Sequence, residues 1–174
     1  MPIAESLLPE FDLEMENTRR ILERIPTDDF DWKPHDKSFT LGKLATHVAA
    51  LPGWAAMTFT TDELDIAPVG GEPMQQPQCH STQDLLDQLS RDSAAGRKAL
   101  LSMSDTDLMK PWSLKAGGKE IMTMPKVAIY RGMIMNHLIH HRAQITVYLR
   151  LRGVPLPAMY GPTADEPGAF GPPA

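Results

Sequence analysis

The chain has 174 residues, of which 42% are hydrophobic and 22% are charged, and its formal net charge is −5. These values fit a single domain over residues 1–174 with a buried core, and the acidic balance argues against nucleic acid or an anionic membrane as a partner. One cysteine, Cys79, excludes an internal disulfide, and no leader peptide or bilayer-length apolar run is found, so a cytoplasmic location is expected.

Apolar residues at spacings of three and four predict two helices in the first third of the chain. The first is expected over residues 3–25. The second is expected to begin at an N-cap, Ser38 or Thr40, and to run to about residue 60. Pro52 lies inside this second segment and predicts a kink there, because the apolar pattern continues beyond it.

Two further helices are predicted in the rest of the chain. One spans roughly residues 81–102, and the longest spans roughly residues 124–152, where Gly153 is expected to close it. The tail that follows is rich in proline, so its first half is expected to pack on the helices and its last few residues to fray.

No segment shows sustained alternation of apolar and polar residues, so the chain is predicted to be all-α, a four-helix bundle. Two connections, residues 62–80 and 103–123, are longer than a tight helix–helix turn requires. Either of them is long enough to cross the full length of the bundle.

Three histidines are the candidates for chemistry. His137 and His141 are four residues apart in the last predicted helix, so their side chains lie on one face, where two neutral imidazoles can bind one divalent metal ion. His47 lies on the apolar face of the second helix and becomes a third ligand if the two helices pack together. Without such packing, these histidines are ordinary polar or core residues.

Other residues are weaker candidates for the surroundings of this site. His140 is three residues from His137 but falls toward the flank of the helix, where it suits a supporting position. The remaining candidates for contacting the metal ligands or lining the pocket are Asp12, Glu16, Trp54 and Tyr130. The first two are one turn apart and usually such acids face solvent, while the two aromatic residues suit a core as well as a pocket.

Two segments resemble those of a known family. The stretch NHLIHHRAQITVYLRLRGVPLPAMYGPTADE is similar to the C-terminal signature of the DinB-like (YfiT-like) metalloenzymes, and WKPHDKSFTLGKLATHVAALPGW is similar to their second-helix signature. The resemblance implies a four-helix bundle in which a crossover joins the second and third helices. It also implies one divalent metal ion, zinc or nickel, whose three ligands map to His47, His137 and His141.

The resemblance implies a function as well. Relatives of this fold include transferases that use low-molecular-weight thiols, so the first expectation is a thiol-dependent S-transferase acting on a small electrophile. The alternatives are a hydrolase that uses metal-bound hydroxide and a non-catalytic metal-binding stress-response protein. A homodimer is also implied, and Met135, Ile139 and Thr146 are predicted to face away from the core toward a partner.

Overall fold

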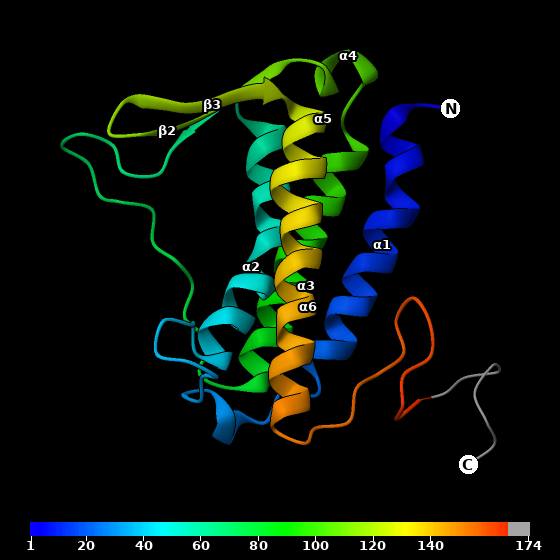
Figure 1. Cartoon of the computed structure of the whole chain (residues 1–174). Helices are drawn as coiled ribbons and strands as arrows, with labels where there is room; N and C mark the ends of the chain where they lie inside the picture. The colour runs from blue at the N-terminus through cyan, green and yellow to red at the C-terminus, as the bar shows by residue number, and fades with distance from the viewer. Residues whose placement is uncertain (167–174) are drawn as a thin grey trace.

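The computed structural model describes residues 1–166, and long helices dominate it (Figure 1). Three of these helices lie close to the ranges predicted from sequence: α1 (Ile3–Leu22), α2 (Leu41–Thr60) and α3 (Thr82–Leu101). The last helical run consists of α5 (Lys126–Ile129), a π-helical segment (Tyr130–Met135) and α6 (Asn136–Leu151). Two short helices, η1 (Thr27–Asp29) and α4 (Asp105–Leu108), lie in the connections.

The helix ends follow from local chemistry. The hydroxyl of Thr40 accepts a hydrogen bond from the Lys43 backbone N–H at 3.2 Å, which makes Thr40 the N-cap of α2. At the end of α6, Gly153 has a φ of +72°, and the next backbone N–H donates to the carbonyl of Leu149. This arrangement is a Schellman motif, and it confirms Gly153 as the helix stop.

α2 and α3 run in the same direction, so the chain between them must return along the length of the helices (Figure 1). The expectation that a long connection crosses the helices is therefore confirmed for residues 61–81. α2 packs against α3 and α6, and α1 packs against the same two helices. This neighbour order brings α2 and α6, which carry the candidate histidines, into direct contact.

The prediction of an all-α chain is wrong, because three strands form a small sheet at one end of the helices (Figure 1). β1 (Glu63–Asp65) pairs in parallel with β2 (Pro111–Ala116), which pairs antiparallel with β3 (Lys119–Pro125). Trp112 in β2 is 2% exposed and donates its indole N–H to the hydroxyl of Thr61. The sheet thus joins the core through the end of α2.

A tight turn closes the β2–β3 hairpin. Gly117 and Gly118 both have positive φ, +60° and +73°, as the two central residues of a type I′ hairpin turn require. Their backbone N–H groups donate to the carboxylate of Asp65, which ties the turn to β1.

The last helix differs from its prediction in two respects. It begins at Lys126 rather than near residue 124, because Met124 and Pro125 belong to β3. Its second turn is π-helical, and a π-helical turn changes which residues face the core relative to an uninterrupted α-helix.

α2 and α3 approach each other closely at one point. α2 continues through Pro52, as predicted, and a Cβ atom added to Gly96 of α3 would lie 2.7 Å from the Pro52 carbonyl oxygen. A glycine in the interior of a helix costs about 1 kcal/mol relative to alanine, so its presence here reflects the lack of space.

We expect Gly96→Ala to lower the free energy of unfolding by roughly 1–3 kcal/mol, the usual cost of overpacking, despite the better helix propensity of alanine. Urea denaturation measures this change. The matched control is Gly132→Ala, whose added Cβ meets no atom within 4 Å. A Gly96 variant as stable as the Gly132 variant would contradict the packing argument.

The first part of the tail packs on the helices, as predicted. Val154, Leu156 and Met159 contact the core, and Pro157 is buried. The predicted fraying falls on the last few residues, which lie outside the described part of the chain. Within residues 1–166, no helix has the length and apolar character needed to cross a membrane.

Candidate metal centre

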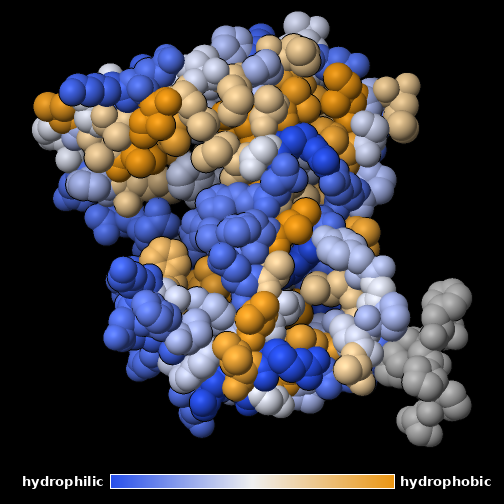
Figure 2. Space-filling view, viewed as in Figure 1, coloured by the Kyte–Doolittle hydropathy of each residue, from blue (hydrophilic) through white to orange (hydrophobic). Residues whose placement is uncertain are grey.

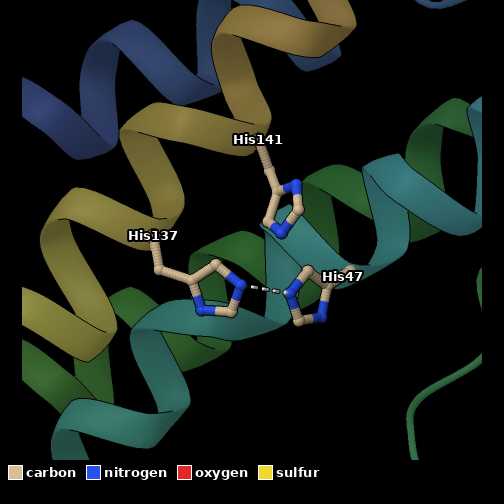
Figure 3. A group of neighbouring side chains, drawn as sticks. All are labelled: His47, His137 and His141. Carbon is tan, nitrogen blue, oxygen red and sulfur yellow. Dashed lines mark hydrogen bonds between the residues drawn. The ribbon is translucent and has the colours of Figure 1, made fainter.

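Three histidine side chains converge where α2 faces α6 (Figure 3). His47 comes from α2, and His137 and His141 come from successive turns of α6. Their ring centroids form a nearly equilateral triangle with sides of 4.9, 5.1 and 4.6 Å. One ring nitrogen from each residue lies within 4.8 Å of the other two. The structure therefore brings together the three residues that the sequence singled out.

The outer nitrogens of the two α6 histidines have hydrogen-bond acceptors. Nδ1 of His137 lies 3.2 Å from the Met133 carbonyl oxygen, and Nδ1 of His141 lies 2.8 Å from Oε1 of Gln144. A neutral imidazole that donates from Nδ1 has a free lone pair on Nε2. Both rings are thus held in the tautomer that binds a metal through Nε2.

The spacing of the inner nitrogens fits a metal ion. Nε2 of His47 and Nε2 of His137 are 3.3 Å apart. Two nitrogens bound at about 2.0–2.1 Å to one tetrahedral ion are roughly 3.3–3.4 Å apart. Without an ion, a proton on one of these atoms must separate the two lone pairs, and His47 is the donor because His137 carries its proton on Nδ1. A change of tautomer at His47 frees the third lone pair.

Burial favours the neutral rings of His47 and His137. Burial, followed by the proximity of His137 and His141, lowers the pKa of His47 to about 4. Burial and the nearby His141 also lower the pKa of His137. Since metal ligation requires the neutral ring, the site favours the ligating form well below neutral pH.

The three histidines open onto a pocket of about 750 Å³. Its other walls come from the start of α2 and from the crossover: Phe39, Gly42, Lys43, Thr46 and residues 76–80. Figure 2 shows the face indented between the sheet and the opposite end, with hydrophilic residues gathered over its middle. A small molecule that enters this pocket reaches the inner nitrogens of the histidines.

The two acidic candidates lie elsewhere. Asp12 accepts two hydrogen bonds from Arg97 of α3, and Glu16 pairs with Arg19 on its own helix. Both acids line a separate groove between α1 and α3. Neither belongs to the histidine cluster, because α1 packs on α3 and α6 away from the α2–α6 contact.

The aromatic candidates belong to the core rather than to the pocket wall. Tyr130 is fully buried with its ring 5.6 Å from that of Phe59, and burial raises the pKa of its hydroxyl. Trp54 is half-buried and packs against the core two turns beyond His47. Neither residue is among those that line the histidine pocket.

Gln144 is a supporting residue that the sequence interpretation missed. Its oxygen accepts from His141, and its amide nitrogen lies 3.2 Å from Nε2 of His140. His140 thus contacts Gln144, which in turn contacts His141. The signal was present in the sequence, because Gln144 follows these histidines by three and four residues.

We expect Gln144→Ala to weaken metal binding about tenfold, within the range observed when the partner of a metal-bound histidine is removed. His140→Ala should have a smaller effect, because His141 keeps its acceptor. Competition with a chromophoric chelator measures both affinities. If His140→Ala bound metal more weakly than Gln144→Ala, the assignment of Gln144 as the direct partner of His141 would be wrong.

The predicted partner surface needs one correction. Met135 is 1% exposed, so it is a core residue and does not face a partner. The π-helical segment, which Met135 ends, explains the error because it displaces the residue from its expected face. Ile139 and Thr146 remain partly exposed.

Comparisons with known proteins agree with this architecture. The sequence model of the DinB family matches residues 2–169. The chain is 28% identical over 167 residues to Bacillus subtilis (strain 168) uncharacterized protein YrdA, covering 96% of this chain and 93% of that protein.

Two solved structures are similar over most of their length. A DinB-like protein from Bacillus cereus has a TM-score of 0.68 at 26% identity, covering 90% of this chain and 97% of that chain. The DinB-like protein YjoA from Bacillus subtilis has a TM-score of 0.68 at 18% identity, covering 88% of this chain and 97% of that chain. The second likeness bears on the fold alone.

Proposed function

The chain belongs to the DinB family, and from this membership and its histidine cluster we propose that it is a divalent-metal-dependent enzyme, a thiol-dependent S-transferase. The observation that carries the proposal is the position of His47, His137 and His141 on the wall of a pocket. Among the described residues, this cluster contains no fourth protein ligand. Three protein ligands beside a pocket are typical of reactive rather than structural metal sites.

A bound zinc or nickel ion would supply a positive charge that holds a small thiol as its thiolate. Residues of the chain itself would orient the histidines and shape the pocket. Gln144 and the Met133 carbonyl orient the two α6 imidazoles, and the buried position of His47 keeps its ring neutral. Phe39 and Pro77 add apolar surface to the pocket wall.

In the proposed reaction, the thiol sulfur forms a bond to an electrophilic carbon of the second substrate. The thiol proton goes to solvent, and the leaving group departs with the electron pair of the broken bond. This reaction needs no separate general base once the thiol is ionised. The pocket is compatible with this reaction, because its described lining contains no carboxylate that could act as a base.

The residues that line the pocket and the absence of a fourth ligand in the described cluster also favour the transferase over the two alternatives. A hydrolase would need a base to activate water; the described pocket lining offers no carboxylate for this role and only His80 as an imidazole outside the three-histidine cluster. A structural metal site would need a fourth ligand, and Asp12 and Glu16 are engaged by arginines elsewhere. The homodimer and the cytoplasmic location stay predictions from the sequence.

The test uses tag-free protein loaded with zinc or nickel. We expect it to couple small thiols to 1-chloro-2,4-dinitrobenzene, and we expect His47→Ala to lose this activity. Hydrolysis of nitrophenyl esters without any thiol would favour the hydrolase instead. A protein that binds metal but shows neither activity would favour the non-catalytic alternative.

The metal-free protein should lose stability as the pH falls from about 6.5 to about 4. The folded pKa of His47 is about 4, whereas its ordinary value is 6.5, so the unfolded chain binds more protons in this window. The free energy of unfolding therefore decreases as the pH decreases. Urea denaturation across this range should give a flatter pH dependence for His47→Ala than for the exposed-histidine control His35→Ala. Equal slopes would contradict the assignment.

A further inference from the structure

The histidine pocket has an unusual charge for this protein. The chain carries a net charge of −5, yet the described residues that line the pocket include a lysine and no carboxylate. Two acids lie next to this lining: Asp31 borders a smaller cavity of about 250 Å³ that Lys43 also borders, and Asp84 accepts a hydrogen bond from the backbone N–H of His80 in the pocket wall. Asp31 forms no ion pair with Lys43 among the described residues. The lining itself is therefore less acidic than the protein as a whole, and its one formal charge at neutral pH comes from Lys43.

The ammonium group of Lys43 supplies the positive charge of this lining. This group lies 4.9 Å from the centre of the Phe39 ring, which holds the side chain at the pocket wall. Four other lysines, by contrast, have carboxylate partners within 4.0 Å: Lys33, Lys110, Lys115 and Lys126. The ammonium of Lys43 has none within the described chain, so it is available to a ligand.

Lys43 and the three histidines border the same pocket. Lys43 precedes His47 by one turn of α2, so their Cβ atoms are about 5–6 Å apart on one face of the helix. One molecule in the pocket can therefore contact both the ammonium group and the inner nitrogens of the histidines. Gln76 and Gln78 of the crossover add amide donors to the same pocket.

We infer that the pocket selects small thiols that carry a carboxylate, with the sulfur directed to the histidine cluster and the carboxylate bound by Lys43. This inference rests on the proposed function, because it assumes that a metal-bound thiol is a substrate. It adds the chemical class of that thiol and names the residue that selects it.

The test compares three thiols of matched length on tag-free protein loaded with Co²⁺: 3-mercaptopropionate, 3-mercapto-1-propanol and 3-aminopropanethiol. Thiolate binding to Co²⁺ produces a near-ultraviolet charge-transfer band, which reports affinity without any turnover. We expect 3-mercaptopropionate to bind about fivefold more tightly than the neutral thiol, the ratio that one exposed ion pair provides, and the cationic thiol to bind most weakly. High salt should reduce these differences.

Lys43→Gln should remove the preference for the carboxylate while leaving the affinity for 3-mercapto-1-propanol unchanged. The matched control is Lys98→Gln, which removes the same charge from an exposed position on α3 outside the pocket. Equal binding of all three thiols, or a preference that survives Lys43→Gln, would overturn the inference and leave the proposed function standing. If no thiol produced the band, the proposed function would fail and the inference would fall with it.

Discussion

Replacing His47 with alanine is expected to abolish stoichiometric metal binding. His47 is the histidine that α2 contributes, and without it the cluster is reduced to two imidazoles on one face of α6. The loss of affinity should exceed the roughly 10- to 100-fold change caused by losing an outer partner of a ligand, because a coordinating atom itself is removed. Elemental analysis of tag-free protein after gel filtration should show about one metal ion per wild-type chain and far less in the variant.

The matched control for this experiment is His35→Ala. His35 is exposed in the connection before α2, and its Nδ1 accepts a hydrogen bond from the Lys37 backbone N–H. Removing it takes away an imidazole that is remote from the cluster, so the metal content should stay at the wild-type level. Circular dichroism checks that both variants keep their helices. A His47 variant with undiminished metal content would show that the cluster is not the binding site.

Much of the geometry of the histidine cluster could be predicted because it depends on local sequence. A spacing of four fixes the relative position of His137 and His141 on any helix, and the apolar neighbours of His47 show which face of α2 is buried. The contact between α2 and α6 is not local, and it entered the prediction through the family resemblance. Gln144 has the same local spacing signal, but a glutamine on a helix is too common to stand out without coordinates.

The hairpin and the π-helical segment were missed for different reasons. Gly117 and Gly118 between two short apolar runs are a hairpin signal, which a search for long alternating segments overlooks. The π-helical turn at residues 130–135 has no comparable signature, because an added residue in a helix is decided by tertiary packing. Met135 was assigned to the wrong face as a result.

Sequence patterns also fail to predict one buried ion pair. Arg142 is 1% exposed and donates to a carboxylate oxygen of Glu14 at 2.5 Å and to the hydroxyl of Thr18 at 3.1 Å. The hydroxyl of Tyr160, in the tail, donates to the same carboxylate. From the sequence alone, Glu14 and Arg142 would both be expected at the surface because they are charged. Their burial depends on the packing of α1 against α6. The network joins α1, α6 and the tail at a position that follows His141 directly.

We expect Glu14→Gln to lower the free energy of unfolding by about 3–5 kcal/mol, the usual cost of removing one partner of a buried ion pair. The amide keeps the shape of the side chain but leaves the guanidinium of Arg142 buried without a counter-charge, and arginine cannot escape this cost by losing its proton. Urea denaturation of the metal-free protein measures the change directly.

Glu16→Gln is the matched control, because Glu16 lies on the same helix but its ion pair with Arg19 is solvent-exposed. Such pairs contribute about 0–1 kcal/mol, so this variant should unfold almost as the wild type does. Metal content separates stability from ligation, since neither glutamate touches the histidine cluster and both variants should bind about one ion per folded chain. Equal stability of the two variants would mean that the Glu14–Arg142 pair contributes no more than a surface pair. Arg142 would then tolerate the loss of its partner, and the joining of α1, α6 and the tail would depend on apolar packing alone.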